Sequence, residues 1–132
     1  MTDLPEAGGA PLRDEGESPA TPRPAATVIV LRRGGKHSDQ GLEVCLVRRN
    51  PEARFMPGVW VFPGGAVDAK DGEGERAPRL CAVRELEEEA GLEVEADELV
   101  PYSRWITPRI VPVRFDTRFY LALAPAHSPP RP

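Results

Sequence analysis

Few residues of this 132-residue chain are suited to forming disulfides, binding soft metals or crossing a membrane. It has two cysteines, two histidines and 6% aromatic residues. Cys45 and Cys81 lie in predicted regular elements with no metal-ligand spacing around them, so we expect two free, buried thiols. No apolar run approaches the roughly 18 residues of a membrane span, and residues 1–20 lack the basic and apolar regions of a signal peptide. We therefore expect a cytoplasmic protein with no membrane partner.

Positive charge is also in short supply. Lysine and arginine total 17 against 21 acidic residues, for a net charge of -4. This balance predicts no general surface for nucleic acid, although local arginines can still bind phosphates.

Apolar anchors are scarce at both ends, where proline and glycine gather. Residues 1–24 cannot bury enough apolar surface to offset the entropy of ordering and are predicted to be a disordered tail. Residues 125–132 form a proline-rich tail that continues no regular element. Residues 25–124 remain as one domain of modest size.

The middle of the chain predicts an α+β domain with the order strands, loop, helix, strands. Its β-branched and alternating runs are bounded by glycine and proline and predict strands. These strands are 26–33, 42–49 (a hairpin with the first), 59–62, 100–108 and 113–124.

One helix is predicted between Pro78, which the first helical turn tolerates, and Gly91, a suitable C-cap. Apolar residues recur in it at spacings of three and four and predict a buried stripe. The stripe is Leu80, Val83, Leu86 and Ala90, with the carboxylates of Glu85, Glu88 and Glu89 on the opposite face.

Negative charge is crowded into the last turns of this helix. Glu85 and Glu89 repel each other at i,i+4, Glu88 lies beside both, and all three oppose the helix dipole. A solvated helix face is the ordinary explanation of a charge run. A divalent cation would instead make all these interactions favourable, because carboxylate oxygens are the ligands that Mg²⁺ and Mn²⁺ prefer.

The second notable motif is Phe62-Pro63-Gly64-Gly65, directly before the loop that leads into the helix. Two glycines are typical of a tight turn. They also allow backbone atoms to approach a metal ion or a phosphate closely.

The segment Arg84 to Leu92, "RELEEEAGL", resembles the core of the Nudix hydrolase box and meets every fixed position of it. The upstream half departs from the pattern, with Lys70 and Arg76 at the places of the expected glycine and glutamate. If Gly65 is the box glycine, the loop is about five residues longer than usual. Glu73 and Glu75 are then both candidates for the missing glutamate, and the sequence does not choose between them.

The chain also resembles the branch of this family that contains the peroxisomal coenzyme A diphosphatases and their bacterial relatives. "LVRR", Arg54, Gly58 and "FPGG" match the frame of a coenzyme A signature, with Val47 and Trp60 as departures. Coenzyme A or an acyl-CoA is therefore a lead for the substrate.

The resemblance implies an α/β/α Nudix-like sandwich, here expected without its last strand and closing helix. It implies hydrolysis of the pyrophosphate of a nucleoside diphosphate linked to another moiety, with Mg²⁺ or Mn²⁺. The implied metal ligands are Glu85, Glu88, Glu89 and Gly64; the implied catalytic residues are Glu85, Glu88 and Arg84, with Arg84 orienting the glutamates.

The implied substrate contacts are Arg49, Arg54, Phe62 and Gly65, with Arg48 as a further phosphate-binding candidate. Trp105 or Tyr102 is a candidate for stacking on an adenine, against the alternative of a core or rim aromatic. The expected partner is a small nucleotide derivative, with a homodimer as an open alternative. Two other readings stay open: a nucleotide-binding Nudix-fold domain with impaired catalysis, and an acidic helix that serves only as an interaction surface.

Overall fold

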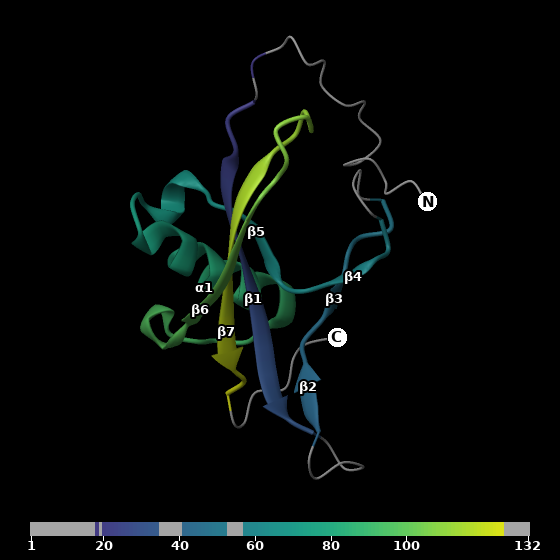
Figure 1. Cartoon of the computed structure of the whole chain (residues 1–132). Helices are drawn as coiled ribbons and strands as arrows, with labels where there is room; N and C mark the ends of the chain where they lie inside the picture. The colour runs from purple at the N-terminus through teal and green to yellow at the C-terminus, as the bar shows by residue number, and fades with distance from the viewer. Residues whose placement is uncertain (1–17, 19, 35–40, 53–56, 126–132) are drawn as a thin grey trace.

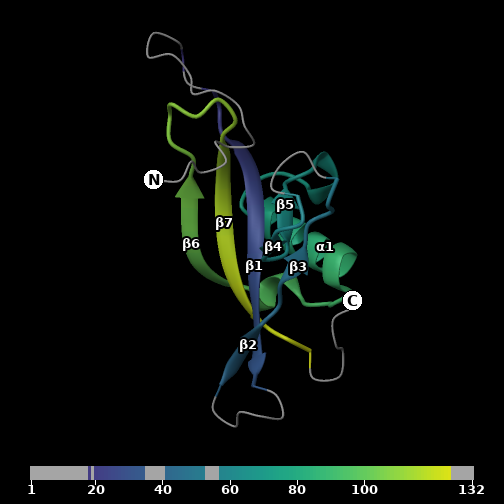
Figure 2. The ribbon, with the colours of Figure 1, turned by 90° about the vertical axis from the view of Figure 1, so that its right-hand side faces the viewer.

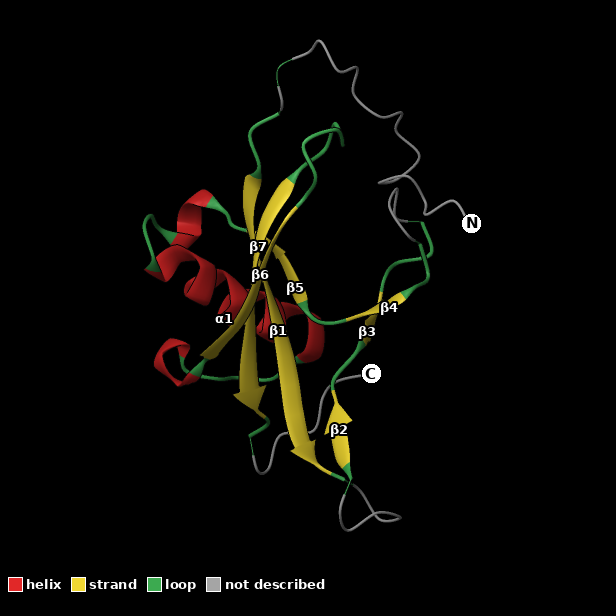
Figure 3. Cartoon of the chain, in the orientation of Figure 1, coloured by secondary structure: helices red, strands yellow, loops and turns green. Residues whose placement is uncertain are grey.

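The computed structural model describes residues 18, 20–34, 41–52 and 57–125. In these residues the chain forms strands, one α-helix and two short 3-10 helices (Figure 3). The strands are β1 (Arg23–Arg33), β2 (Leu42–Val44), β3 (Val47–Arg48), β4 (Trp60–Val61), β5 (Gly64–Ala66), β6 (Val100–Ile106) and β7 (Phe115–Leu123). The helices are η1 (Ala69–Asp71), α1 (Arg76–Ala90) and η2 (Ala96–Glu98). Most of the two predicted tails, 1–24 and 125–132, lies outside the described residues, but β1 already includes Arg23 and Pro24.

The main sheet is mixed, as the predicted fold class requires. Its strand order is β2-β1-β7-β6, and β5 also pairs with β1 (Figure 1). Strands β1 and β7 run parallel, whereas β2 and β5 pair antiparallel with β1, and β6 pairs antiparallel with β7. The predicted strands 26–33, 100–108 and 113–124 are thus confirmed as β1, β6 and β7, and β1 and β7 form the centre of the sheet.

The predicted strand 42–49 is wrong as a single element. Only β2 pairs with β1, opposite Leu31–Arg33, while β3 pairs with β4 in a separate two-stranded sheet. The strand cannot continue along β1 because β5 pairs with β1 along 25–27 and so occupies the rest of that edge. The chain therefore leaves β1 at Cys45, whose N–H still donates to the Val30 carbonyl at 3.1 Å.

Helix α1 packs on one face of the sheet. The core combines alternate residues of β1 and β7 with the buried face of α1, and Leu86 is fully buried within it. In Figure 2, strands β6, β7 and β1 lie side by side with α1 to one side of them. The predicted C-cap is confirmed, since Gly91 is left-handed with φ 71° and its N–H donates to the Glu87 carbonyl at 2.9 Å.

The buried stripe of α1 differs from the predicted one at its first turns. Leu80 is 36% exposed, and the buried residues there are Ala77, Cys81 and Ala82. Small side chains let the helix lie close to the sheet, so the line of contact follows them rather than the bulkier leucine.

Among the described residues no second α-helix covers the other face of the sheet. Several large apolar side chains on β6 and β7 are exposed, including Trp105 and Leu123. In this part of the chain, no helix has both the length and the apolar character needed to cross a membrane.

Candidate functional site

The site begins where α1 meets β5, a strand that glycine-rich sequence did not predict. Gly64 lies so near β1 that a Cβ on it would be 2.3 Å from the Ala26 carbonyl oxygen. Gly65 points to the helix, and a Cβ there would be 2.0 Å from Glu85 Oε2. The two glycines therefore serve close approach: the first lets β5 pair with β1, and the second makes room for a carboxylate.

Glu85 and Glu89, one helical turn apart, are both directed at this glycine pair. Glu89 Oε1 accepts a hydrogen bond from the Gly64 N–H at 2.9 Å, and the Glu85 carboxylate lies against Gly65. Glu85 was expected on the solvent face; its side chain is instead largely covered by β5. Helix α1 thus presents two carboxylates to one stretch of backbone.

Electrostatics at this pair disfavour two negative charges. Burial raises the pKa of the Glu85 carboxyl, and the nearby charge of Glu89 raises it further. Burial also raises the pKa of Glu89, although the Gly64 N–H partly opposes that shift. A cation between the carboxylates would relieve both the desolvation and the repulsion.

Arg84 is held by a carboxylate that sequence reasoning missed. Its Nε and Nη2 donate to Asp71 Oδ1 and Oδ2, both at 2.8 Å, and Asp71 is only 4% exposed. Asp71 also accepts from the Asp68 N–H at 2.8 Å, which closes the turn of η1. The hydrogen bonds with Arg84 lower the pKa of Asp71 and keep it ionised.

Asp71 is a third candidate for the missing glutamate, beside Glu73 and Glu75. Neither of those two glutamates is the partner of Arg84, and Glu75 instead faces Arg118 at 3.7 Å. A signal was available: five residues separate Gly65 from Asp71, the spacing that the family pattern has between its glycine and its glutamate. Counting forward from Gly65 gives Asp71 at the glutamate position, with the extra loop residues after it. Counting back from Arg84 gives Arg76 instead, because the extra residues lie within that interval.

Glu88 contacts Arg84 rather than the glycine pair, but its charge still adds to the raised pKa of Glu85 and of Glu89. The oxygens of Glu88 lie 3.4 and 3.5 Å from Arg84 Nη1, and about half of its side chain is exposed. Arg84 Nη1 also lies 3.6 Å from Glu85 Oε2, so Arg84 connects Asp71 on η1 with Glu85 and Glu88 on α1. That Arg84 orients the glutamates for catalysis stays a prediction.

Cys81 anchors the helix to β5. Its buried Sγ lies 3.4 Å from the carbonyl oxygens of Gly65 and Ala66. Burial raises the pKa of this thiol to about 12, so it stays protonated and unreactive. Both cysteines are free as predicted, but only Cys81 is buried; Cys45 is partly exposed, so the predicted burial is wrong for it.

The structure gives the predicted substrate-binding residues different surroundings. The positive charge of Arg49 partly opposes the rise in the pKa of Glu89 that burial causes, so Arg49 acts electrostatically on the carboxylate pair. Phe62 is half-buried just before β5. Arg48 Nε donates to the Gly58 carbonyl at 3.1 Å, which gives it a structural role. Arg54 lies outside the described residues.

The two candidate stacking residues are not near the glycine pair. Both Trp105 and Tyr102 belong to β6, which β7 and β1 separate from β5. At about 4.8 Å per strand, this places them roughly 14 Å from β5 across the sheet. Both are exposed, so neither is a core aromatic, and stacking on an adenine stays a prediction.

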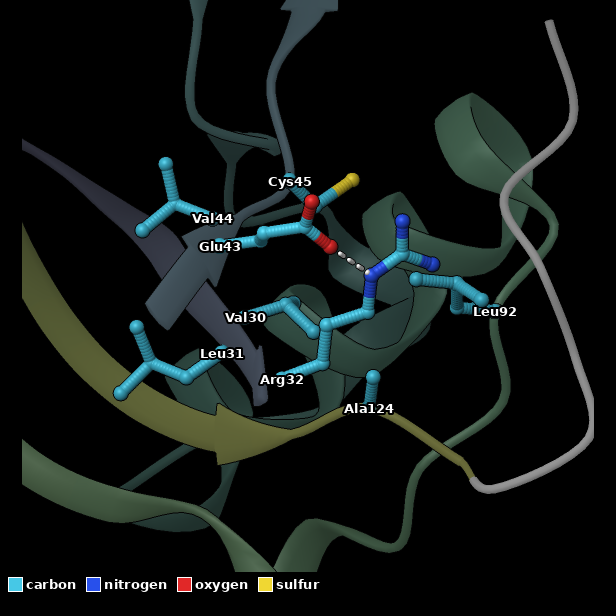
Figure 4. A pocket seen from close by; sticks show the side chains of 8 residues that line it. All are labelled: Val30, Leu31, Arg32, Glu43, Val44, Cys45, Leu92 and Ala124. Atoms are coloured by element: carbon cyan, nitrogen blue, oxygen red, sulfur yellow. Dashed lines mark hydrogen bonds and ion pairs between the residues drawn. The ribbon is translucent and has the colours of Figure 1, made fainter. Parts of the chain in front are cut away.

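A cavity of about 350 Å³ lies between β1, β2 and the residues that follow α1 (Figure 4). Arg32 and Glu43, paired at 2.6 Å, form its polar side, and Cys45 and Leu92 contribute to the rest. Burial raises the pKa of the Cys45 thiol, and the charge of Glu89 raises it further.

The donor set suits a hard divalent cation. Within residues 18, 20–34, 41–52 and 57–125 no three His, Cys, Asp or Glu side chains are arranged to hold a metal ion. Two carboxylates, those of Glu85 and Glu89, do converge on the backbone of the glycine pair, where no side chain blocks access. Carboxylate and carbonyl oxygens are the ligands that Mg²⁺ and Mn²⁺ prefer. The residues fit such a cation chemically, with Glu85 and Glu89 as the pair that it would join.

Comparison with solved structures identifies the fold. A crystal structure of a NUDIX hydrolase from Alicyclobacillus acidocaldarius matches with a TM-score of 0.62 and 29% identity, over 78% of this chain and 70% of that one. The mixed sheet with its acidic loop-helix is therefore a Nudix fold.

The sequence comparisons give the family. The NUDIX domain family matches residues 21–132, and the chain belongs to the Nudix hydrolase family. A Caenorhabditis elegans protein named "Putative nudix hydrolase 7" is 30% identical over 136 residues, or 76% of this chain and 44% of that protein. "Peroxisomal coenzyme A diphosphatase ndx-8", also from C. elegans, is 34% identical over 100 residues, or 76% of this chain and 37% of that protein. The chain thus spans less than half the length of these curated relatives.

Proposed function

We propose that this domain hydrolyses the pyrophosphate of a nucleoside diphosphate linked to another moiety, with Mg²⁺ or Mn²⁺ as cofactor and coenzyme A or an acyl-CoA as the leading substrate. The observation that carries the proposal is the carboxylate pair, Glu85 and Glu89, directed at Gly64 and Gly65. The similarity to a coenzyme A diphosphatase supports the choice of substrate.

Each residue of the site has a proposed part in this reaction. Glu85, Glu89 and the Gly64 carbonyl hold the cation, which, when bound, neutralises phosphate charge and activates water. Glu88 can turn from its long contact with Arg84 to serve as a further ligand or to hold the water. The buried Asp71 carboxylate fixes Arg84, and Arg84 in turn keeps α1 and its glutamates in place.

Substrate contacts are proposed for the arginine and the backbone nearest this pair. Arg49 lies close enough to influence Glu89 and is suited to a substrate phosphate, because a guanidinium binds phosphate oxygens in pairs. The backbone at Gly65 and the ring of Phe62 form the neighbouring wall, and Arg54 remains a proposed contact. The proposed setting is the cytoplasm, a reducing compartment that would keep Cys45 and Cys81 free.

The decisive experiment is a hydrolysis assay on coenzyme A, ADP-ribose and NADH with Mg²⁺ or Mn²⁺, with products separated by chromatography. We expect metal-dependent cleavage of at least one compound and a loss of at least about a hundredfold in Glu85→Gln and Glu89→Gln. Glu87→Gln is the matched control, since it removes the same charge from an exposed position of the same helix. Unchanged activity in both site variants would sink the assignment.

A thermal melt separates metal binding from turnover. Mn²⁺ must raise the melting midpoint if it binds the native state. We expect this rise in the unaltered protein and in Glu87→Gln, and its loss in Glu85→Gln. No rise in the unaltered protein would favour the reading of α1 as an interaction surface.

A nucleotide-binding domain with impaired catalysis is the second candidate. The observation that favours it is that, among the described residues, no three His, Cys, Asp or Glu side chains are arranged to hold a metal ion. Calorimetry that detects coenzyme A binding, together with no product in the assay, would select it over the first.

A further inference from the structure

A second cavity lies away from the carboxylate pair and is rich in arginine. It has a volume of about 510 Å³ and lies between the N-terminal end of α1 and strands β6 and β7. Arg79, Arg104 and Arg118 line it, together with Glu75 and Tyr102. Because β1 and β7 separate β6 from β5, this cavity is distinct from the site at Gly64 and Gly65.

Two of these arginines face each other across neighbouring strands. Arg104 on β6 is in register with Arg118 on β7, so their side chains lie on the same face of the sheet. Like charges placed directly opposite each other destabilise a strand pair. A negative group between them therefore gains from both guanidinium groups.

Each of the two arginines has a carboxylate partner, but the two contacts differ in strength. Arg104 makes a close two-bond contact with Asp116, at 2.8 and 2.6 Å. Arg118 faces Glu75 at 3.7 Å, beyond ordinary hydrogen-bond length, and the Glu75 side chain is 90% exposed. The Arg118–Glu75 contact is thus loose and screened by water, and a stronger anion can replace Glu75.

The remaining walls are fixed in position. Arg79 Nη1 donates to the carbonyls of Ala96 and Leu99 at 3.0 and 2.8 Å, and its guanidinium lies 5.4 Å from the centre of the Tyr120 ring. Tyr102 is 64% exposed at the cavity, so its ring can lie against a flat ligand group. The cavity therefore combines a rigid cationic wall with an accessible aromatic ring.

We propose that this cavity is a second binding site, for a small molecule that carries a terminal phosphate and a planar ring. The phosphate oxygens bind the paired N–H donors of Arg118, and Glu75 swings away into solvent as the anion enters. Arg104 stays bonded to Asp116 and contributes its positive charge from the neighbouring strand. Guanidinium groups favour phosphate because their paired N–H donors match its oxygens. The planar ring packs on Tyr102.

Calorimetry with metal-free protein in EDTA tests this proposal independently of hydrolysis. The probes are inorganic phosphate, adenosine 5′-monophosphate and adenosine. We expect both phosphates to bind more weakly as salt rises, and adenosine to bind far more weakly than the monophosphate. Arg118→Gln should weaken phosphate binding about tenfold, the loss of one charge-assisted contact.

Glu75→Gln provides a variant with the opposite expected sign. Removing the competing carboxylate should tighten phosphate binding several-fold. Tyr102→Leu should weaken the monophosphate but leave inorganic phosphate unchanged. Arg118→Lys keeps the charge at this strand position and should give an intermediate affinity, which separates anion binding from any failure of Arg118→Gln to fold.

Two results would overturn the proposal: phosphate affinity that is unchanged in Arg118→Gln, or affinity that is unchanged or weaker in Glu75→Gln. Glu89→Gln distinguishes the two sites, since it should abolish hydrolysis and leave phosphate binding in EDTA intact. If Glu89→Gln removes phosphate binding while Arg118→Gln does not, the ligand occupies the site at Gly64 and Gly65. If the protein hydrolyses a substrate but binds no phosphate in EDTA, this inference fails and the proposed function stands. If it binds phosphate in EDTA but hydrolyses nothing, the proposed function fails and this inference stands.

Discussion

Replacing Asp71 with asparagine removes the charge that holds Arg84 in place while keeping the size of the side chain. Asp71 lies on η1, outside the helix that carries the glutamates, and its carboxylate is almost fully buried. It accepts two bonds of 2.8 Å from Arg84 and one of 2.8 Å from the Asp68 N–H. An asparagine offers one acceptor oxygen and sets an N–H₂ group against the guanidinium.

The expected loss of stability follows from these contacts. Breaking a buried ion pair by removing one partner costs roughly 3 to 5 kcal/mol. Arg84 remains about one-fifth exposed, so water can solvate part of the freed guanidinium and reduce the cost. We therefore expect Asp71→Asn to lower the free energy of unfolding by about 3 kcal/mol.

Urea denaturation of the two proteins at neutral pH measures this difference. Asp71→Glu is the matched control, since it keeps the charge and the acceptors on a longer side chain and should lose less. Arg84→Lys tests the two-bond geometry from the other side, because an ammonium cannot reproduce the guanidinium fork. A loss below about 0.5 kcal/mol in Asp71→Asn would refute the reasoning, since that is the range of ordinary surface substitutions.

The pH dependence supplies a sign that can be checked. Hydrogen bonds from Arg84 lower the pKa of Asp71 in the folded protein below its value in the unfolded chain. The stabilisation by Asp71 is then fully present above the unfolded pKa of about 4 and is lost as the pH falls through the folded pKa. The stability difference between the unaltered protein and Asp71→Asn should therefore shrink below about pH 4, and a constant difference would contradict this origin.

Two further predictions concern the core and the glycine pair. Leu86 is 0% exposed between α1 and the sheet, so Leu86→Ala should lower the unfolding free energy by about 2 to 5 kcal/mol in urea, against a smaller loss for the half-buried Val83 in Val83→Ala. An equal loss in both variants would argue against the described core. Gly65→Ala would place a methyl group on the Glu85 carboxylate. It should reduce the Mn²⁺-induced rise of the melting midpoint, and an unaltered rise would show that Glu85 does not hold the cation.

Local features of the chain could be predicted because their causes are local. Helix α1 ends at Gly91 since glycine adopts the left-handed conformation readily. The strands β1, β6 and β7 follow from their apolar and β-branched residues. Strand β5 could not be predicted in the same way, because Gly64 and Gly65 are weak strand formers and pair only where β1 offers a free edge.

The sequence by itself determined the Nudix fold, the acidic end of α1 and the presence of a glycine pair before it. The tertiary structure decided which groups meet. Asp71, rather than Glu73 or Glu75, reaches Arg84 because η1 turns its carboxylate inward beneath the helix. Glu85 leaves the solvent face because β5, without a side chain at Gly65, leaves room for it. The spacing from Gly65 could have singled out Asp71, but both contacts depend on how a loop and a strand lie against the helix in space.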